Sequence, residues 1–206
     1  MNSKDHPSYT LRQNLRHKRR HLSRIKQHQH SQAITRRIIH CRLYKHSRHI
    51  AVYLSADGEV DLSLLINKLQ SQYKKCYLPV ILSRRHAIMR FAPYEKNTRL
   101  RKNCFGILEP VYQKKQLKPA RQLDLVLAPL VGFDGQGNRM GMGGGFYDRA
   151  LQHLKQQSTA GNLRPKYVGI AHEVQKVAQL ESHHWDIQLH AIITERQLSY
   201  FHQLTE

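Results

Sequence analysis

The sequence predicts an α/β fold in which helices flank a mostly parallel sheet. Short apolar runs recur along the chain, and most are separated by segments whose apolar residues have helical spacing. Strands that alternate with helices form parallel sheets covered on both faces. The chain has 206 residues, which suits one domain of ordinary size. We therefore expect a single three-layer domain over residues 1–206, with basic helices at its N-terminal end.

Residues 8–50 are expected to form two amphipathic helices. Six aliphatic residues recur there near helical spacing: Leu11, Leu15, Leu22, Ile25, Ile34 and Ile38. Residues 1–50 hold 13 Lys/Arg and one acid, and the whole chain has a formal net charge of +20. We interpret these helices as packing on the domain with solvated basic faces. Such a charge attracts anions, either nucleic acid or a small polyanionic substrate.

The remaining elements follow from apolar runs and turn signals. Asp57-Gly58 marks a turn, and Asp61 or Ser63 is expected to cap the helix that follows it. Pro79 indicates an edge strand or a bulge, and residues 97–109 are expected to form a loop. The predicted strands cover 49–55, 76–82, 88–92, 123–130, 166–171 and 191–194, and the predicted helices cover 60–73 and 146–157.

Seven of the eleven glycines lie within residues 132–145. Glycine lets the backbone approach a phosphate and turn its N–H groups toward it. A helix beginning near Gly145 would add the positive end of its dipole, and Arg139 could bind phosphate oxygens in bidentate fashion. The Walker A motif is absent and the Rossmann glycine spacing fits poorly. We interpret this segment as the phosphate loop of a nucleotide-using enzyme, with a flexible loop or hairpin as the alternative.

Asp148 follows the glycines directly. A carboxylate beside a phosphate is compatible with a bridging Mg²⁺, which typically takes one or two carboxylates plus phosphate oxygens. Asp186 is the second carboxylate that we expect at such a site. The alternative for Asp148 is a helix N-terminal acid that interacts with the helix dipole.

The other reactive side chains carry no motif. Three widely spaced cysteines without CxxC predict reduced thiols and a cytoplasmic protein, and no apolar stretch is long enough to span a membrane. The closest histidine groups lack HExxH or cysteine partners and are expected at the surface: His28 and His30, and His183 and His184.

Six segments carry a resemblance to one family: LRQNLRHKRRHLS at 11–23, VYLSADGEVD at 52–61, NCFGILEP at 103–110, PLVGFDGQGNRMGMGGGFYDR at 129–149, YVGIAHEVQ at 167–175 and WDIQLHAIITE at 185–195. With them the chain resembles the 5-formyltetrahydrofolate cyclo-ligases, or methenyltetrahydrofolate synthetases. The resemblance implies a NagB/RpiA/CoA transferase-like fold. It also implies conversion of 5-formyltetrahydrofolate, with ATP and Mg²⁺, to 5,10-methenyltetrahydrofolate, ADP and phosphate. The formyl oxygen would be phosphorylated and N10 would attack. A monomer that accepts folate, including polyglutamylated folate, is expected.

The same resemblance implies the site residues. Arg139 and Tyr147 match catalytic positions, and Asp148 and Asp186 match the magnesium ligands. Leu54 and Glu59 would line the folate pocket with Tyr147. There a carboxylate suits the amino-pyrimidine edge of the pterin. Without the resemblance, Glu59 would be interpreted as a helix N-terminal acid. The implied ATP-binding residues are Arg12, Arg139, Met140, Gly141, Met142, Gly143, Gly144, Gly145, Phe146 and Tyr147.

Ser8 stands where the family usually has an ATP-contacting lysine, so Arg12 or a neighbouring arginine is expected to make that contact. Two other functions stay open. The net charge is compatible with a basic nucleic-acid-binding protein, whose binding would weaken steeply with salt. Only 8% of the residues are aromatic, however, and no recognition motif is visible. A nucleotide-binding module without catalysis would bind ATP but would not turn over formylfolate.

Overall fold

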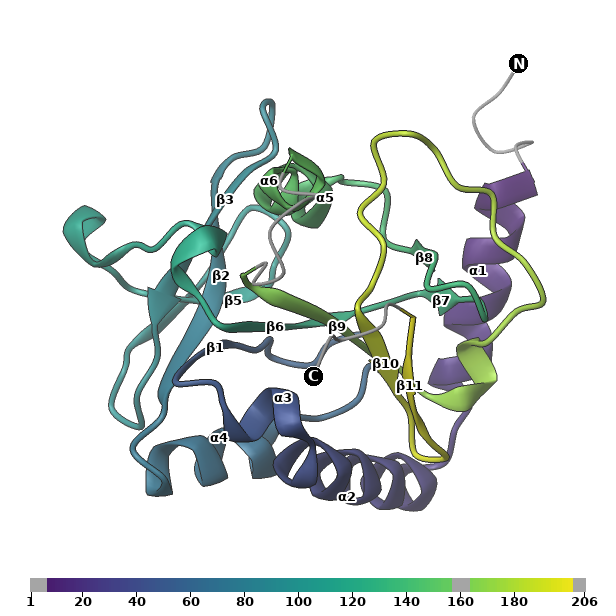
Figure 1. Cartoon of the computed structure of the whole chain (residues 1–206), viewed down its shortest axis with the longest axis horizontal. Helices are drawn as coiled ribbons and strands as arrows, with labels where there is room; N and C mark the ends of the chain where they lie inside the picture. The colour runs from purple at the N-terminus through teal and green to yellow at the C-terminus, as the bar shows by residue number, and fades with distance from the viewer. Residues whose placement is uncertain (1–6, 157–163, 202–206) are drawn as a thin grey trace.

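A computed structural model describes residues 7–156 and 164–201, which form a seven-stranded sheet covered by helices on both faces (Figure 1). Five central strands are parallel, and an antiparallel strand closes each edge. This is the predicted α/β architecture. The strand order is β11 (Leu198–Tyr200), β10 (Ala191–Ile193), β9 (Lys166–Ile170), β6 (Leu125–Pro129), β1 (His49–Ala51), β2 (Lys75–Ser83) and β3 (Ile88–Pro93).

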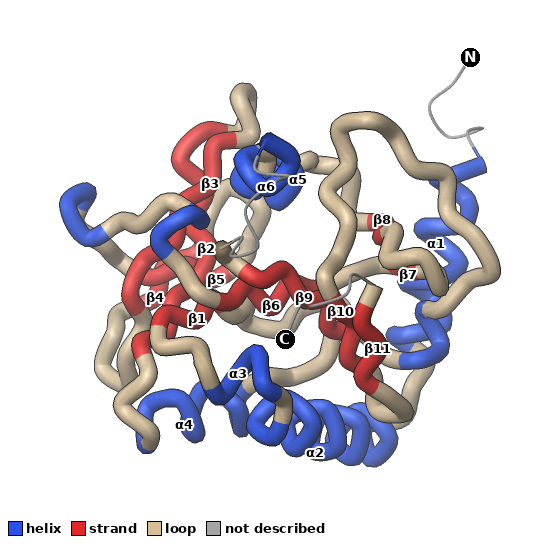
Figure 2. The backbone as a smooth tube through the Cα atoms, in the orientation of Figure 1, coloured by secondary structure: helices blue, strands red, loops and turns tan. Residues whose placement is uncertain are grey.

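The helices form the two outer layers. One face of the sheet carries α2 (Arg24–His40), α3 (Arg42–Lys45) and α4 (Ser63–Ser71) (Figures 1 and 2). The other face carries α5 (Phe146–Leu151) and α6 (His153–Gln156), which replace the single helix predicted there. Helix α1 (Pro7–Arg20) lies beside a small hairpin of β7 (Gly132–Phe133) and β8 (Arg139–Met140).

The sheet separates two apolar cores because successive side chains of a strand point to opposite faces. Along β6, Leu125 and Leu127 belong to the core under α2 and α4. Val126 and Ala128 belong to the core under α5 and α6. This double burial explains why the central strands are continuous apolar runs in the sequence.

Several predicted boundaries differ from the structure. The 97–109 segment, expected to be a loop, contains β4 (Leu100–Lys102) and pairs it with β5 (Leu108–Pro110), while β11 was not predicted. The pairing of β2 with the short strand β1 ends at Tyr77. Pro79 lies beyond this point, so the N–H that proline lacks removes no hydrogen bond between β2 and β1. Short 3-10 turns connect other elements: η1 (Lys114–Gln116), η2 (Ala120–Gln122) and η3 (Glu173–Gln175).

The start of α4 differs from the predicted one by three residues. The helix begins at Ser63 and its N-cap residue is Leu62, so the expectation of Asp61 or Ser63 as the cap is wrong, although Asp61 Oδ1 accepts the Ser63 backbone N–H at 2.9 Å. Within the described ranges, no helix is both long and apolar enough to cross a membrane.

Candidate functional site

The glycine segment leaves the β7–β8 hairpin and runs exposed from Gly141 to Gly145, where α5 begins. Gly143 and Gly145 have φ values of +91° and +62°, which side-chain-bearing residues rarely adopt. A Cβ atom at Gly141, Gly143 or Gly145 would meet no atom within 4 Å. These glycines therefore do not serve close packing of protein on protein. They leave an open loop whose backbone is accessible.

The turn of the preceding hairpin is held by Asp134, a fully buried carboxylate that sequence reasoning missed. Its oxygens accept the backbone N–H groups of Gln136, Asn138 and Leu180 and the Asn138 side-chain amide, at 2.9–3.0 Å. Burial alone would raise the pKa of Asp134, but these donors outweigh it and lower the pKa. The ionised carboxylate fixes the geometry from which the glycine loop departs.

Arg139 is the first residue of β8, and its side chain is only 7% exposed. It donates to Asp148 Oδ1 at 2.7 Å and to the Ile187 carbonyl at 2.7 Å, and it lies 4.9 Å from the centroid of the Tyr167 ring. Burial lowers the pKa of Arg139, but neighbouring Tyr167, Asp148 and Asp186 outweigh burial and raise it. The guanidinium therefore stays charged and organises the groups around it.

The two aspartates predicted to bind magnesium lie on adjoining segments. Asp148 Oδ1 accepts the Ile187 backbone N–H at 3.1 Å, so Asp148 contacts the residue that follows Asp186. Asp186 Oδ2 accepts the His183 backbone N–H at 2.7 Å. Two carboxylates are as many as Mg²⁺ usually takes from a protein when phosphate oxygens complete its shell. The structure is compatible with this ligand pair, which stays a prediction.

Glu59 belongs to the loop between β1 and α4. Helix α4 begins four residues later, so the interpretation of Glu59 as a helix N-terminal acid is wrong. Its Oε2 accepts the Ala56 backbone N–H at 3.1 Å, and its Oε1 lies 3.5 Å from Arg19. Burial raises the pKa of Glu59 to about 6, although Arg19 acts to lower it. The carboxylate is therefore poorly compensated within the protein.

Tyr147 directly follows the glycine loop, in the first turn of α5. Its ring stacks on Tyr167 with centroids 6.1 Å apart. Burial raises the pKa of Tyr147, and the neighbouring Tyr167 and Glu59 raise it further. Leu54 packs against the core on the same β1–α4 connection. The phenol is therefore a neutral hydrogen-bonding group at neutral pH.

Helix α1 contributes arginines whose roles were not predicted. Arg16, Arg19 and Arg20 all donate to the carboxylate of Asp57. Arg19, only 1% exposed, also donates to the backbone carbonyls of Asp57 and Leu130 at 2.8 and 2.9 Å. The prediction that the basic faces of both N-terminal helices are solvated is wrong for α1. Arg12, Arg16 and Arg19 share one helical face, but the sequence does not show what that face packs against.

Arg12, which is predicted to contact ATP, lies against the glycine loop. Arg12 Nε donates to the Gly141 carbonyl at 2.9 Å, so α1 contacts the glycine loop as well as the Asp57 turn. Between these contacts, Leu15 is buried against Gly132, where a Cβ atom would lie 2.6 Å from the Leu15 side chain. Helix α1 therefore spans the two loops that carry the predicted ATP and folate residues.

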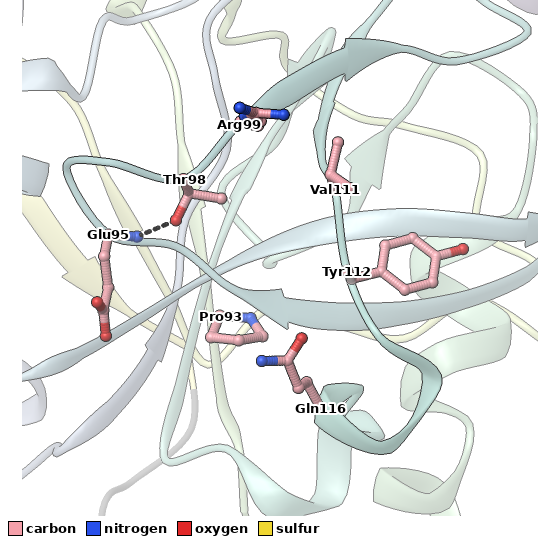
Figure 3. A pocket seen from close by; sticks show the side chains of 7 residues that line it. All are labelled: Pro93, Glu95, Thr98, Arg99, Val111, Tyr112 and Gln116. Carbon is pink, nitrogen blue, oxygen red and sulfur yellow. Dashed lines mark hydrogen bonds between the residues drawn. The ribbon is translucent and has the colours of Figure 1, made fainter.

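A separate hollow lies near β3 and β5 and holds none of the predicted site residues (Figure 3). Its volume is about 350 Å³, and the Thr98 hydroxyl accepts the Glu95 backbone N–H at 2.8 Å on its wall. It is lined by Pro93, Glu95, Thr98, Arg99, Val111, Tyr112 and Gln116. The glycine loop is an exposed surface rather than part of this cavity.

A mostly parallel sheet with an open glycine loop beside a buried carboxylate is typical of enzymes that bind phosphorylated ligands. The model of the 5-formyltetrahydrofolate cyclo-ligase family matches residues 4–195, and the chain belongs to this family. The 5-formyltetrahydrofolate cyclo-ligase of Haemophilus influenzae is 37% identical, covering 89% of this chain and 95% of that protein. The Escherichia coli K12 enzyme of the same name is 36% identical, covering 87% and 96%.

Solved structures agree with this relationship. The 5,10-methenyltetrahydrofolate synthetase of Aquifex aeolicus superimposes with a TM-score of 0.79 at 27% identity, covering 94% of this chain and 92% of that one. The synthetase of Mycoplasma pneumoniae superimposes with a TM-score of 0.71 at 26% identity, covering 92% and 99%. The family and fold predicted from the sequence are confirmed.

Proposed function

We propose that the protein converts 5-formyltetrahydrofolate to 5,10-methenyltetrahydrofolate with ATP and Mg²⁺. The observation that carries the proposal is that α1 contacts both an open glycine loop, through Arg12, and a weakly compensated carboxylate, Glu59, through Arg19. The first suits a polyphosphate, and the second suits the N–H edge of a pterin. The names of the relatives supply the reaction that uses both.

The chemistry asks mainly for positioning and charge stabilisation. The γ-phosphoryl group of ATP is transferred to the formyl oxygen, which releases ADP and makes the formyl carbon electrophilic. N10 of the folate then attacks that carbon and loses its proton, and the phosphate leaves with the former formyl oxygen. No protein nucleophile is needed. Arg139 would stabilise the transferred phosphoryl charge, and the neutral Tyr147 phenol would hydrogen-bond near the reacting formyl group.

The loop from Met140 to Phe146 and Arg12 would bind the ATP phosphates, and Glu59 and Leu54 would bind the pterin. The proposal is of a cytoplasmic monomer that also accepts polyglutamylated folate. The nucleic-acid alternative loses support because Arg16, Arg19 and Arg20 bind Asp57, and Arg12 binds Gly141. If RNA or DNA binds nonetheless, its affinity should fall steeply as salt rises.

The test is a turnover assay on purified, folded protein. ATP, Mg²⁺ and 5-formyltetrahydrofolate are mixed with it, and the near-ultraviolet absorbance of the methenyl product is followed. Product should form only when ATP is present. Binding of ATP without any ATP-dependent product would reject the enzyme and favour the non-catalytic nucleotide-binding module.

The magnesium ligands are tested best at Asp186, because Asp148 also forms an ion pair with Arg139. We predict that Asp186→Asn raises the Mg²⁺ concentration needed for half-maximal turnover by roughly tenfold or more, as expected for a lost ligand. Asp148→Asn should do the same and also lower turnover at saturating Mg²⁺. An unchanged Mg²⁺ requirement in Asp186→Asn would remove this residue from the metal site.

A further inference from the structure

Two histidines and a glutamate from three separate elements meet outside the proposed ATP and folate site. His30 lies on α2, His172 follows β9, and Glu195 follows β10. His30 Nδ1 is 2.9 Å from His172 Nδ1 and 3.7 Å from Glu195 Oε2. One donor atom from each residue lies within 4.8 Å of the other two, and no other cluster of this kind occurs among the described residues.

The fold itself brings these groups together. Strands β9 and β10 are parallel neighbours, and Ile170 lies opposite Ile193. His172 and Glu195 each come two residues after a member of this pair. Side chains at such equivalent positions lie side by side at the carboxyl edge of the sheet. Helix α2 then presents His30 to them. The expectation that His30 is a surface residue is therefore wrong, whereas His28 is exposed as predicted.

We propose that His30, His172 and Glu195 bind one divalent cation of the zinc type, separate from the catalytic Mg²⁺. Zinc is held by nitrogen and oxygen donors at about 2.0–2.1 Å in tetrahedral geometry, which places two ligand atoms about 3.3 Å apart. The observed separations of 2.9 and 3.7 Å lie on either side of this value. At these two separations, the His30 ligand atom needs to shift by only a few tenths of an ångström from each neighbour, and the third separation is within 4.8 Å.

The donor set determines which cation fits. Two imidazoles and one carboxylate suit zinc and its borderline neighbours, whereas Mg²⁺ prefers oxygen ligands. Three protein ligands leave a fourth position for water. The His30 and Glu195 side chains are 17% and 14% exposed, which gives a cation access from one side.

The contacts around the cluster also suit a metal ligand. The short contact between the two Nδ1 atoms uses a single proton, which a cation would displace. A residue outside the cluster holds the Glu195 carboxylate in place, because Glu195 Oε2 accepts the Glu173 backbone N–H at 3.0 Å. Support of this kind is usual around metal ligands.

A cation here would join α2 to the ends of two central strands. No residue of the proposed ATP and folate site is a ligand, although His172 also hydrogen-bonds the backbone of Gly58, which directly precedes Glu59. Occupancy can therefore be measured without ATP or folate, and its result is independent of the proposed catalytic activity.

The experiment uses the full chain after treatment with a chelator. Zn²⁺ binding is measured by competition with a chromophoric chelator, and Co²⁺ binding is measured by its visible absorption. The wild type should bind one equivalent that millimolar Mg²⁺ does not displace. His30→Gln and Glu195→Gln should each weaken this binding at least tenfold. His28→Gln, an exposed histidine on the same helix, should bind like the wild type.

Each outcome decides the proposal. Thermal unfolding with Zn²⁺ gives a second reading, since a cation that binds only the folded state raises the melting temperature. The rise should be present in the wild type and in His28→Gln but absent in the two ligand variants. Absence of stoichiometric binding by the wild type, or equal loss in His28→Gln, would overturn the site. If His30→Gln does not fold, Glu195→Gln gives the same decision.

Discussion

Glu59 provides a stability prediction whose magnitude follows from its surroundings. Burial raises the pKa of this carboxyl from 4.5 to about 6, although Arg19 acts in the opposite direction. An acid with a raised pKa in the folded state contributes stability below its unfolded pKa, and this contribution is lost as the pH rises through the folded pKa. A shift of 1.5 pKa units corresponds to about 2 kcal/mol. Ionised Glu59 therefore costs the native state roughly that amount at pH 8.

Replacing Glu59 with glutamine removes this titration. The difference in unfolding free energy between Glu59→Gln and the wild type should change by about 2 kcal/mol between pH 4 and pH 8, in favour of the variant at the higher pH. Urea unfolding at both pH values measures this difference. Glu181→Gln, which replaces an exposed carboxylate, is the matched control and should show no such change.

The same variant should lose function while it gains stability. A pterin amino edge donates hydrogen bonds, which an ionised carboxylate accepts on both oxygens but a glutamine amide accepts on only one. The KM for 5-formyltetrahydrofolate should therefore rise at least tenfold in Glu59→Gln, and in the wild type it should rise as the pH falls below 6. Two results together would refute both the pKa argument and the substrate role. The first is a difference in unfolding free energy between Glu59→Gln and the wild type that does not change with pH, and the second is a KM of Glu59→Gln equal to that of the wild type.

Three further predictions concern the contacts behind the site. Arg19→Met should destabilise the fold by about 3 kcal/mol, because it removes a buried charge from three acceptors. Arg20→Met, which replaces a half-exposed side chain bound to the same Asp57, should cost under about 1 kcal/mol. Urea unfolding measures both values. Gly58→Ala should lower the melting temperature more than Gly106→Ala. Both glycines have φ near +75°, but only at Gly58 does the added Cβ meet helix α1, at 3.2 Å. Asp134→Ala should cost about 3 kcal/mol in urea, since four donors lose their acceptor; an effect below 1 kcal/mol would contradict its role in the hairpin.

The glycine loop could be predicted because its signal is local. Gly143 and Gly145 have positive φ values, which glycine adopts most readily, and no protein atom packs against them. Both conditions favour glycine at these positions, so the loop can be identified from a few consecutive residues. Similarly, β6 is apolar throughout because both its faces are buried. The contact of Glu59 with Arg19 on α1 has no local signal. From its neighbours alone, Glu59 would be interpreted as an acid at the N-terminus of the following helix, and only the family resemblance suggested a substrate role.

Contacts between distant segments account for what was missed. Arg19 has the sequence surroundings of a surface arginine, and its burial depends on how α1 docks against the Asp57 turn. His30 looks like its exposed neighbour His28 until α2 is placed over the ends of β9 and β10. In both cases the residue type and spacing are unremarkable for a solvated basic helix. The information lies in the strand register and helix docking, which depend on the whole core.

The basic character of α1 is best explained by the site it supports. Arg16, Arg19 and Arg20 share the single carboxylate of Asp57, which leaves a local excess of positive charge beside Glu59. A surface for nucleic acid would need these guanidinium groups in solvent, whereas Arg19 is 1% exposed and Arg16 is largely covered. The positive charge of this cluster instead offsets part of the cost of burying an ionised Glu59 and attracts polyanions such as ATP and folate. The contact of Arg12 with Gly141 extends that field along the same helix to the glycine loop.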